Sequence, residues 1–320
     1  MRDDALAIAI EAPAEAPPLA AAAHARRSAA GIACIVASAL CFGSMPLFVR
    51  MASAAGTGTD TLLLLRFSIA SAILGTVAAI RRTPLPRGRG LALLAGMGAI
   101  GYAGQALSFC LAIQLASTGL ASLLLYLYPA LVTVLSRVVL RHPLTPVQVG
   151  AVGAALAGSL LTIGRAGDGT VAGIAFGLSA ALIYAGYILV GSRLPAGITP
   201  TASAAVVTAS AAVVFGVVAV VRGVRLPTTA AGWWGVAGLA FVCTVLAISL
   251  FLAGLERLGP MRASIYSTLE PPFTMLLGAL FLAEDVTLVR AAGGALILGA
   301  VIVLARSDVA RRDGPSPGIA

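Results

Sequence analysis

Long apolar stretches alternate with short polar connections along almost the whole chain. About 20 apolar residues in a helix, rising ~1.5 Å each, cross the ~30 Å hydrocarbon core of a bilayer. Ten stretches approach that length, at 31–51, 61–80, 90–111, 118–140, 146–163, 171–190, 201–221, 231–252, 261–283 and 286–305. Their spacing predicts an all-α integral membrane protein with ten transmembrane helices joined by short loops. Residues 1–28 and 307–320 lack such a stretch and are predicted to be tails, the first of them disordered.

The composition also indicates a membrane protein. Of 320 residues, 59% are hydrophobic and 10% are charged, which is too little charge for the surface of a soluble domain of this size. The net charge of +9 comes from arginines scattered between the apolar stretches, where they fit membrane orientation better than a nucleic-acid interface. Most arginines fall on the inner side if the N-terminus is cytoplasmic, although six fall outside or at outer span ends, including Arg222 and Arg225 together in one loop. We therefore expect a multi-pass protein of the cell inner membrane with both termini cytoplasmic.

The sequence offers no support for a metal, cofactor or nucleotide site. The four cysteines all lie in apolar stretches without a Cys-x-x-Cys pair, so neither a disulfide nor a metal site is implied. The chain contains no lysine and no Gly-x-x-x-x-Gly-Lys-Ser/Thr loop. We expect no bound cofactor and no ATP site.

The two halves of the chain repeat. A shift of 142 residues places Gly31 on Gly173 and Pro129 on Pro271. The predicted units are residues 29–165 and 169–306. Because each unit has an odd number of spans, the second would enter the bilayer from the opposite face. This predicts two inverted five-helix repeats, which are typical of secondary transporters that handle substrate where the repeats meet.

The stretch 261–283 carries one acid near its centre, Glu270, followed by Pro271 and Pro272. A charged side chain at mid-depth costs at least ~2.5 kcal/mol, so such residues usually face a bundle interior or a water-filled cavity. The prolines cannot donate backbone hydrogen bonds, which predicts a bent or broken helix at Glu270. We expect Glu270 to bind a substrate ammonium group or a coupling proton. The alternative is a protonated carboxyl that hydrogen-bonds a neighbouring helix only for packing.

Five further residues are candidates for the substrate site. They are polar or aromatic groups expected at mid-depth in spans of both repeats: Tyr128, Tyr266, Gln105, Tyr184 and Tyr187. The 142-residue shift pairs Tyr128 with position 270, so its hydroxyl could donate to the Glu270 carboxylate. Tyr266 lies one turn before Glu270 on the same helix face. Each candidate could instead serve helix packing, and Arg66, near the outer end of its span, could bind substrate or snorkel to the membrane surface.

The sequence resembles the drug/metabolite transporter superfamily, specifically its bacterial EamA-type proteins with two five-helix repeats. The resemblance covers about residues 30–306 and rests on ASLLLYLYPALVTVLSRVVL, on ASIYSTLEPPFTMLLGALFLAED and on Arg66 in LLLLRFSIAS. Arg141 and His142 depart from it, because many relatives carry an acid there. The resemblance implies a transporter of small polar metabolites, amino acids being the best-known class, with a central cavity and alternating access and without cofactor or ATP.

We therefore predict a secondary transporter of small polar metabolites, an inner-membrane exporter of amino acids or related compounds. Its partners would be the small-molecule substrate, membrane lipid and, as a candidate coupling ion, protons; monomer and homodimer stay open. A lipid flippase or a membrane partner subunit is the alternative, and it predicts a groove open sideways to lipid. An integral-membrane enzyme fits less well, because Glu270 is the only carboxyl well inside a predicted span and no acid/base pair or metal cluster can form at depth.

Overall fold

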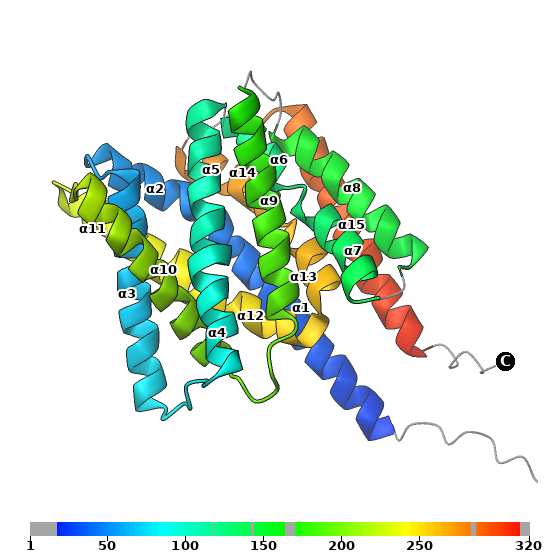
Figure 1. Ribbon diagram of the computed structural model, residues 1–320. Helices are drawn as coiled ribbons and strands as arrows, with labels where there is room; N and C mark the ends of the chain where they lie inside the picture. Colours follow the sequence, from blue (N-terminus) through cyan, green and yellow to red (C-terminus); the bar gives the residue numbers. More distant parts are fainter. Residues whose placement is uncertain (1–17, 117, 142–143, 164–169, 283–285, 314–320) are drawn as a thin grey trace, which may run out of the picture.

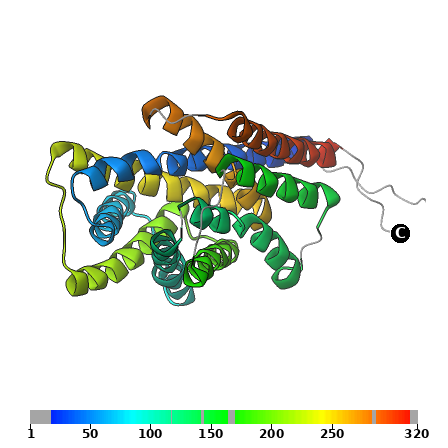
Figure 2. The same ribbon diagram turned by 90° about the horizontal axis from the view of Figure 1, so that it is seen from above.

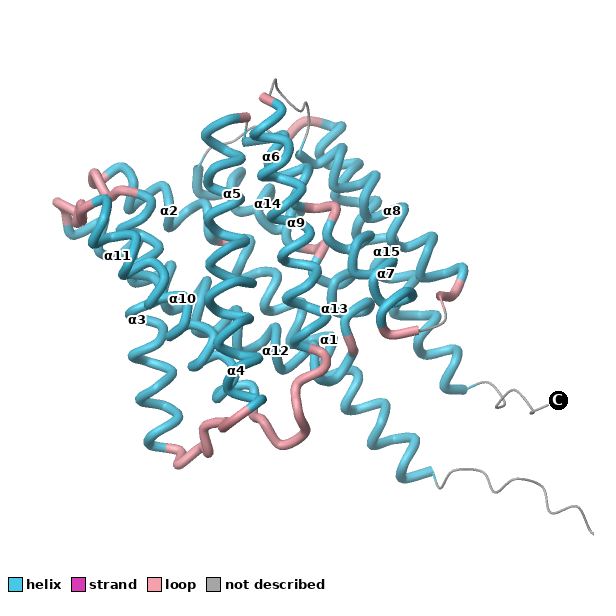
Figure 3. Tube along the Cα trace, viewed as in Figure 1, coloured by secondary structure: helices cyan, strands magenta, loops and turns pink. Residues whose placement is uncertain are grey.

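The computed structural model describes residues 18–116, 118–141, 144–163, 170–282 and 286–313. Within these ranges the regular elements are all helices, and no strand occurs. Figure 1 shows a bundle of long, tilted helices, and Figure 3 shows the short loops that connect them. The predicted all-α class is therefore confirmed for the described part of the chain.

Five of the ten apolar stretches form one helix each, and the other five are divided. The first half contains α1 (Pro18–Gly43), α2 (Met45–Ala54), α3 (Thr59–Ile80), α4 (Arg89–Gly96), η1 (Met97–Tyr102), α5 (Ala103–Leu115), α6 (Thr118–Leu125), α7 (Tyr128–Val139) and α8 (Pro146–Ile163). The second half contains α9 (Val171–Gly191), α10 (Pro200–Arg222), α11 (Ala230–Ala240), η2 (Phe241–Leu246), α12 (Ala247–Leu258), α13 (Pro260–Ser267), α14 (Glu270–Leu282) and α15 (Leu288–Asp313). The elements η1 and η2 are π-helices that join their α-helical neighbours into continuous rods.

Within the described part of the chain, six helical segments are long and apolar enough to cross a membrane. They are Arg26–Ala54, Thr59–Ile80, Arg89–Ala112, Val171–Gly191, Pro200–Arg222 and Ala230–Leu258. Shorter apolar helices accompany them, so the expected number of ten spans stays a prediction. Large apolar side chains such as Val138, Val220 and Leu288 are exposed on the outside of the bundle, as a lipid environment requires.

Helix continues into both regions that were expected to be tails. The helix α1 begins at Pro18, within the predicted tail 1–28, and α15 ends at Asp313, within the predicted tail 307–320. Residues 1–17 and 314–320 lie outside the described part of the chain.

The stretch that carries Glu270 is broken where its sequence predicted. The helix α13 ends at Ser267 and α14 begins at Glu270, because Pro271 and Pro272 cannot continue the backbone ladder. The first half has an equivalent break, between α6 and α7 at residues 126–127. A third break divides α1 from α2 at Ser44, two residues before Pro46. Each break releases backbone groups from the regular ladder in the middle of an apolar stretch.

The two halves of the chain interlock. The most extensive helix pairs each take one member from each half: α8 with α15, α3 with α10, α1 with α12 and α5 with α9. Figure 1 shows α8 and α15 side by side, and Figure 2 shows the same bundle from above. Neither half therefore forms a separate compact body, and the core lies where the halves meet.

Candidate functional site

Glu270 lies where two broken helices of the two halves meet. It is the first residue of α14 and is half-buried among the helices. The hydroxyl of Tyr126, which lies in the break between α6 and α7, donates a hydrogen bond to its carboxylate. Among the described residues Glu270 forms no ion pair. The site therefore presents an acid whose direct polar partner is a neutral hydroxyl.

The break between α1 and α2 adjoins the same place. The hydroxyl of Thr274, one turn after Glu270, donates to the carbonyl of Gly43 over 3.1 Å. A Cβ atom at Gly43 would lie 3.2 Å from the carbonyl oxygen of Glu270, a tight contact that glycine avoids. All three interior breaks thus converge on the start of α14.

Tyr128 does not make the predicted hydrogen bond to Glu270. It is the first residue of α7 and is 2% exposed, and its hydroxyl lies near Ser267 without forming a regular hydrogen bond. Its ring instead packs edge-on against Tyr184, with 4.7 Å between ring centroids. Tyr126, two residues earlier in the irregular turn, takes the place that the repeat alignment gave to Tyr128.

Five of the six tyrosines form a continuous series of ring contacts, here called the tyrosine chain. Its links are Tyr126–Tyr128 at 6.4 Å, Tyr128–Tyr184 at 4.7 Å, Tyr184–Tyr187 at 6.0 Å and Tyr187–Tyr102 at 5.9 Å between centroids. Such distances are those of favourable aromatic pairs. The tyrosine chain crosses the interior from the Glu270 site to η1.

The remaining predicted residues differ in their surroundings. Gln105 on α5 is half-buried, as is Tyr184 on α9. Tyr266 on α13 is fully buried in the main hydrophobic core, and Tyr187 is 4% exposed. The structure brings Tyr128, Tyr184 and Tyr187 together, and one shared cavity for all five candidates stays a prediction.

Arg66 is buried instead of reaching the membrane surface. Its side chain on α3 is 5% exposed and is held by three oxygen acceptors. Its Nε donates to the Thr244 hydroxyl over 2.7 Å, and its Nη2 donates to the Tyr102 hydroxyl over 2.9 Å and to the Cys243 carbonyl over 3.0 Å. The guanidinium also lies 5.1 Å from the Phe67 ring centroid, within cation–π range. Snorkelling is therefore excluded by these contacts.

The two π-helices supply these acceptors. Tyr102 ends η1 in the first half, and Cys243 and Thr244 lie within η2 in the second half. The Thr244 hydroxyl donates to the Leu239 carbonyl five residues back, over 2.8 Å, which leaves its oxygen free to accept from Arg66. A π-turn is often found at a functional site, since its extra residue turns side chains and carbonyls out of the α-helical register.

The sequence prediction missed Tyr126, Tyr102 and Thr244. Tyr126 could have been found by expecting the equivalent breaks of the two repeats to meet, since it aligns with Thr268 in the second break. Tyr102 and Thr244 depend on the π-helices, which the apolar pattern does not show. The described residues contain no group of three His, Cys, Asp or Glu side chains that could hold a metal ion.

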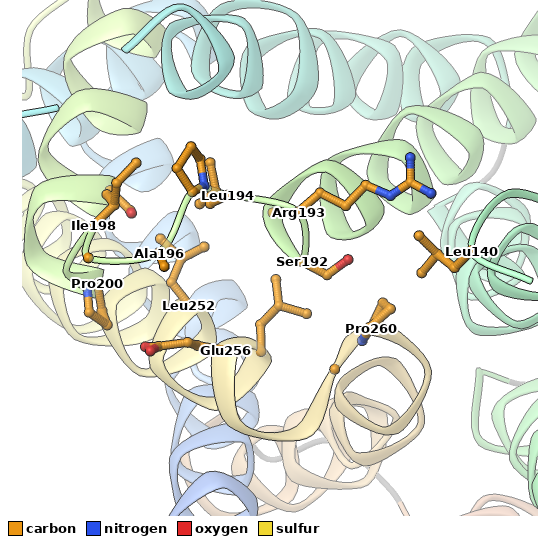
Figure 4. Close-up of a pocket in the computed structure, with 16 residues that line it drawn as sticks. Leu140, Ser192, Arg193, Leu194, Ala196, Ile198, Pro200, Leu252, Glu256 and Pro260 are labelled. Carbon is orange, nitrogen blue, oxygen red and sulfur yellow. The ribbon is translucent and has the colours of Figure 1, made fainter. Parts of the chain in front are cut away.

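A pocket of about 310 Å³ lies at one end of the bundle, away from Glu270. It is lined by the loop between α9 and α10, by the end of α12 and by the start of α13. Figure 4 shows the side chain of Arg193 extending from that loop toward the end of α7. There its Nη2 donates to the Val139 carbonyl over 2.8 Å. This contact ties the loop between α9 and α10 in the second half to the last helical turn of α7 in the first.

Comparisons with known proteins give one family. The sequence model of the EamA-like transporter family matches the chain twice, over residues 29–164 and 171–306. The chain is 27% identical over 281 residues to the "Uncharacterized transporter YcbK" of Bacillus subtilis (strain 168), covering 84% of this chain and 90% of that protein. It is also 27% identical over 273 residues to an "Uncharacterized transporter" of Archaeoglobus fulgidus, covering 85% and 95%. A solved structure described as "Crystal structure of protein" shares the fold, with a TM-score of 0.77 and 21% identity over 87% of this chain and 98% of that one.

Proposed function

Because this chain belongs to the EamA-like transporter family, we propose that it is a secondary transporter that exports a small polar metabolite across the inner membrane by alternating access. The family and the names of the relatives point to small-molecule transport instead of catalysis. The proposed substrates are amino acids or related compounds with an ammonium group. Protons are the proposed coupling ion.

The half-buried Glu270 without a cationic partner carries this proposal. A carboxyl group that is deep in a membrane protein and lacks an ion pair is a candidate binding site for a cation or a proton. If a substrate ammonium group and a proton compete for it, each weakens the binding of the other by the same factor. Such competition is sufficient for exchange of substrate against protons.

The helix pairing supports two inverted repeats. In the proposed repeat, α1 corresponds to α9 and α5 corresponds to α12. The α1–α12 contact is therefore the counterpart of the α9–α5 contact, and both are among the main contacts of the bundle. The α3–α10 and α8–α15 pairs each join two corresponding helices, one from each half. These relations are expected of two similar units around a pseudo-twofold axis, which supports ten spans and alternating access at the junction.

The pocket beside Arg193 supports export. With both termini cytoplasmic, as the arginine distribution predicts, this pocket opens toward the cytoplasm. It would then be the vestibule through which substrate enters from the cell.

Substitution of Glu270 tests the proposed function. A thermal-shift screen of the purified protein against amino acids, purines and quaternary amines first identifies a ligand, since binding to the folded state raises apparent stability. In proteoliposomes, Glu270→Gln should abolish transport of that ligand driven by a pH gradient, because it keeps the shape of the side chain and removes its ionisation. Asp60→Asn is the control, since Asp60 forms a surface ion pair with Arg222 over 3.2 Å. Normal transport by Glu270→Gln across the pH range would show that Glu270 serves packing alone.

One observation favours a lipid flippase as a second candidate. A groove of about 440 Å³ runs along α3 and α10 at the edge of the bundle, lined mainly by small side chains such as Gly75 and Ala205. It ends at Arg82, which could meet a lipid phosphate. Filling the groove with Gly75→Leu should stop the movement of a fluorescent phospholipid between leaflets if the flippase reading is correct. It should leave metabolite transport unchanged if the groove is only a surface feature.

A further inference from the structure

Arg66 is a buried cation without an anionic partner. Its three oxygen acceptors, on Thr244, Tyr102 and Cys243, are all neutral. The described residues contain no carboxylate within ion-pair distance of it. A buried charge of this kind is costly unless something pairs with it, so Arg66 is a candidate binding site for an anion.

One edge of the guanidinium remains available. A guanidinium has five N–H donors, of which Nε and Nη2 use three on the oxygen acceptors. Nη1 contacts only the sulfur of Met45, at 3.8 Å, and a thioether is a weak acceptor on a flexible side chain. Its second N–H has no acceptor among the described residues. An incoming anion therefore needs to displace only the Met45 side chain.

That edge lies beside the break between α1 and α2. Met45 begins α2, directly after the break at Ser44, and Gly43 before this break touches the backbone of Glu270. Arg66 and Glu270 are near enough to interact electrostatically but do not form an ion pair. The π-helix acceptors hold Arg66, and the Tyr126 hydroxyl holds Glu270. Two opposite charges are thus kept apart in one interior region.

The tyrosine chain joins these two charged groups. It begins at Tyr126, which donates to Glu270, and ends at Tyr102, which accepts from Arg66. Aromatic rings between a cation and an anion offer an apolar wall to the uncharged part of a ligand. A dipolar molecule that bridges the two charged groups directly would place its ammonium group at Glu270 and its carboxylate at Arg66, beside these rings.

We propose that Arg66 is the anion-binding half of the substrate site and that it selects substrates carrying a carboxylate as well as an ammonium group. This inference rests on the proposed function, since Glu270 must hold the ammonium group. It assigns Arg66 a role in specificity: a primary amine without a carboxylate would fill only half of the site. The loss of one charge-assisted hydrogen bond lowers affinity by about 10- to 100-fold.

The test compares amino acids with their decarboxylated amines. The full-length purified protein is screened against the twenty L-amino acids, and each binder is compared with the amine that lacks its carboxylate, as phenethylamine does for L-phenylalanine. The ratio of the two dissociation constants measures recognition of the carboxylate. In the wild type this ratio should be about 10 to 100. In Arg66→Gln it should fall to near one, because amino-acid binding weakens while amine binding does not. A purely structural arginine would change both affinities together.

Two further variants keep the test decisive. Arg66→Lys retains the buried charge but loses the planar fork, so it should fold even if Arg66→Gln does not, and it should give an intermediate ratio. Arg222→Gln, on an exposed arginine, should leave the wild-type ratio unchanged. If the Arg66 variants keep the wild-type ratio of dissociation constants while Glu270→Gln loses all binding, the role of Arg66 is overturned and the proposed function stands. A wild type that binds no amino acid would overturn the inference together with the proposed substrate class.

Discussion

Gly98→Ala should destabilise the protein by forcing η1 away from α10. A Cβ atom at Gly98 would lie 2.8 Å from the Cβ of Ser210, and it would clash even more closely with the Val207 carbonyl. The carbonyl belongs to the α10 backbone and cannot rotate away, so the two helices must separate. Overpacking of this kind costs about 1–3 kcal/mol.

Gly96→Ala is the matched control two residues earlier on the same rod. A Cβ atom there meets no atom within 4 Å. Both substitutions gain the same ~0.5–1 kcal/mol of helix preference over glycine, so the difference between the variants isolates the steric cost. At about 2–4 °C per kcal/mol, that difference predicts a melting temperature about 2–12 °C lower for Gly98→Ala than for Gly96→Ala.

The measurement is thermal unfolding of both purified variants in the same detergent, followed by loss of the monodisperse peak. Gly98→Ala should also weaken ligand binding, because Tyr102 ends the same π-helix and would move with it. Equal melting temperatures for the two variants would refute the close packing of η1 on α10.

Two further predictions concern orientation and the site. A reporter that works only in the cytoplasm, fused to the C-terminus, should be active because the arginine distribution places both termini inside; a silent cytoplasmic reporter with an active periplasmic one would reverse the topology. Tyr126→Phe removes the hydroxyl that donates to Glu270 and should alter the pH profile of transport, whereas Tyr128→Phe removes a hydroxyl that makes no hydrogen bond to Glu270 and should leave that profile unchanged. Identical pH profiles for these two variants would contradict the placement of Tyr126.

The sequence was sufficient for features that depend on local chemistry. Apolar stretches of membrane length predicted where helices form, because such residues are stable in lipid only with their backbone groups satisfied within the helix. Pro271 and Pro272 predicted the break before Glu270, because two missing N–H groups interrupt the ladder whatever surrounds it.

Features that depend on distant residues could not be predicted in the same way. The repeat alignment brought Tyr128 to Glu270, but a shift of two residues within an irregular turn gave the contact to Tyr126. The burial of Arg66 depends on acceptors 36 and 178 positions away in the chain, Tyr102 and Thr244. Nothing local to α3 distinguishes such an arginine from one that reaches the membrane surface.

The two π-helices suggest how the length of this chain is constrained. A π-turn holds one residue more than the α-helical turn that it replaces, so it is the trace of a single-residue insertion in an otherwise regular rod. Deleting one residue from Met97–Tyr102 or from Phe241–Leu246 would restore an uninterrupted α-helix, leave the flanking turns in register and move the side chains and carbonyls of the turn itself. At these positions the shorter helix would be the more regular one, yet Arg66 would lose the Tyr102 hydroxyl in one case and the Thr244 hydroxyl and Cys243 carbonyl in the other. The added residue in each π-helix therefore makes the helix less regular, but it positions the groups that accept hydrogen bonds from Arg66.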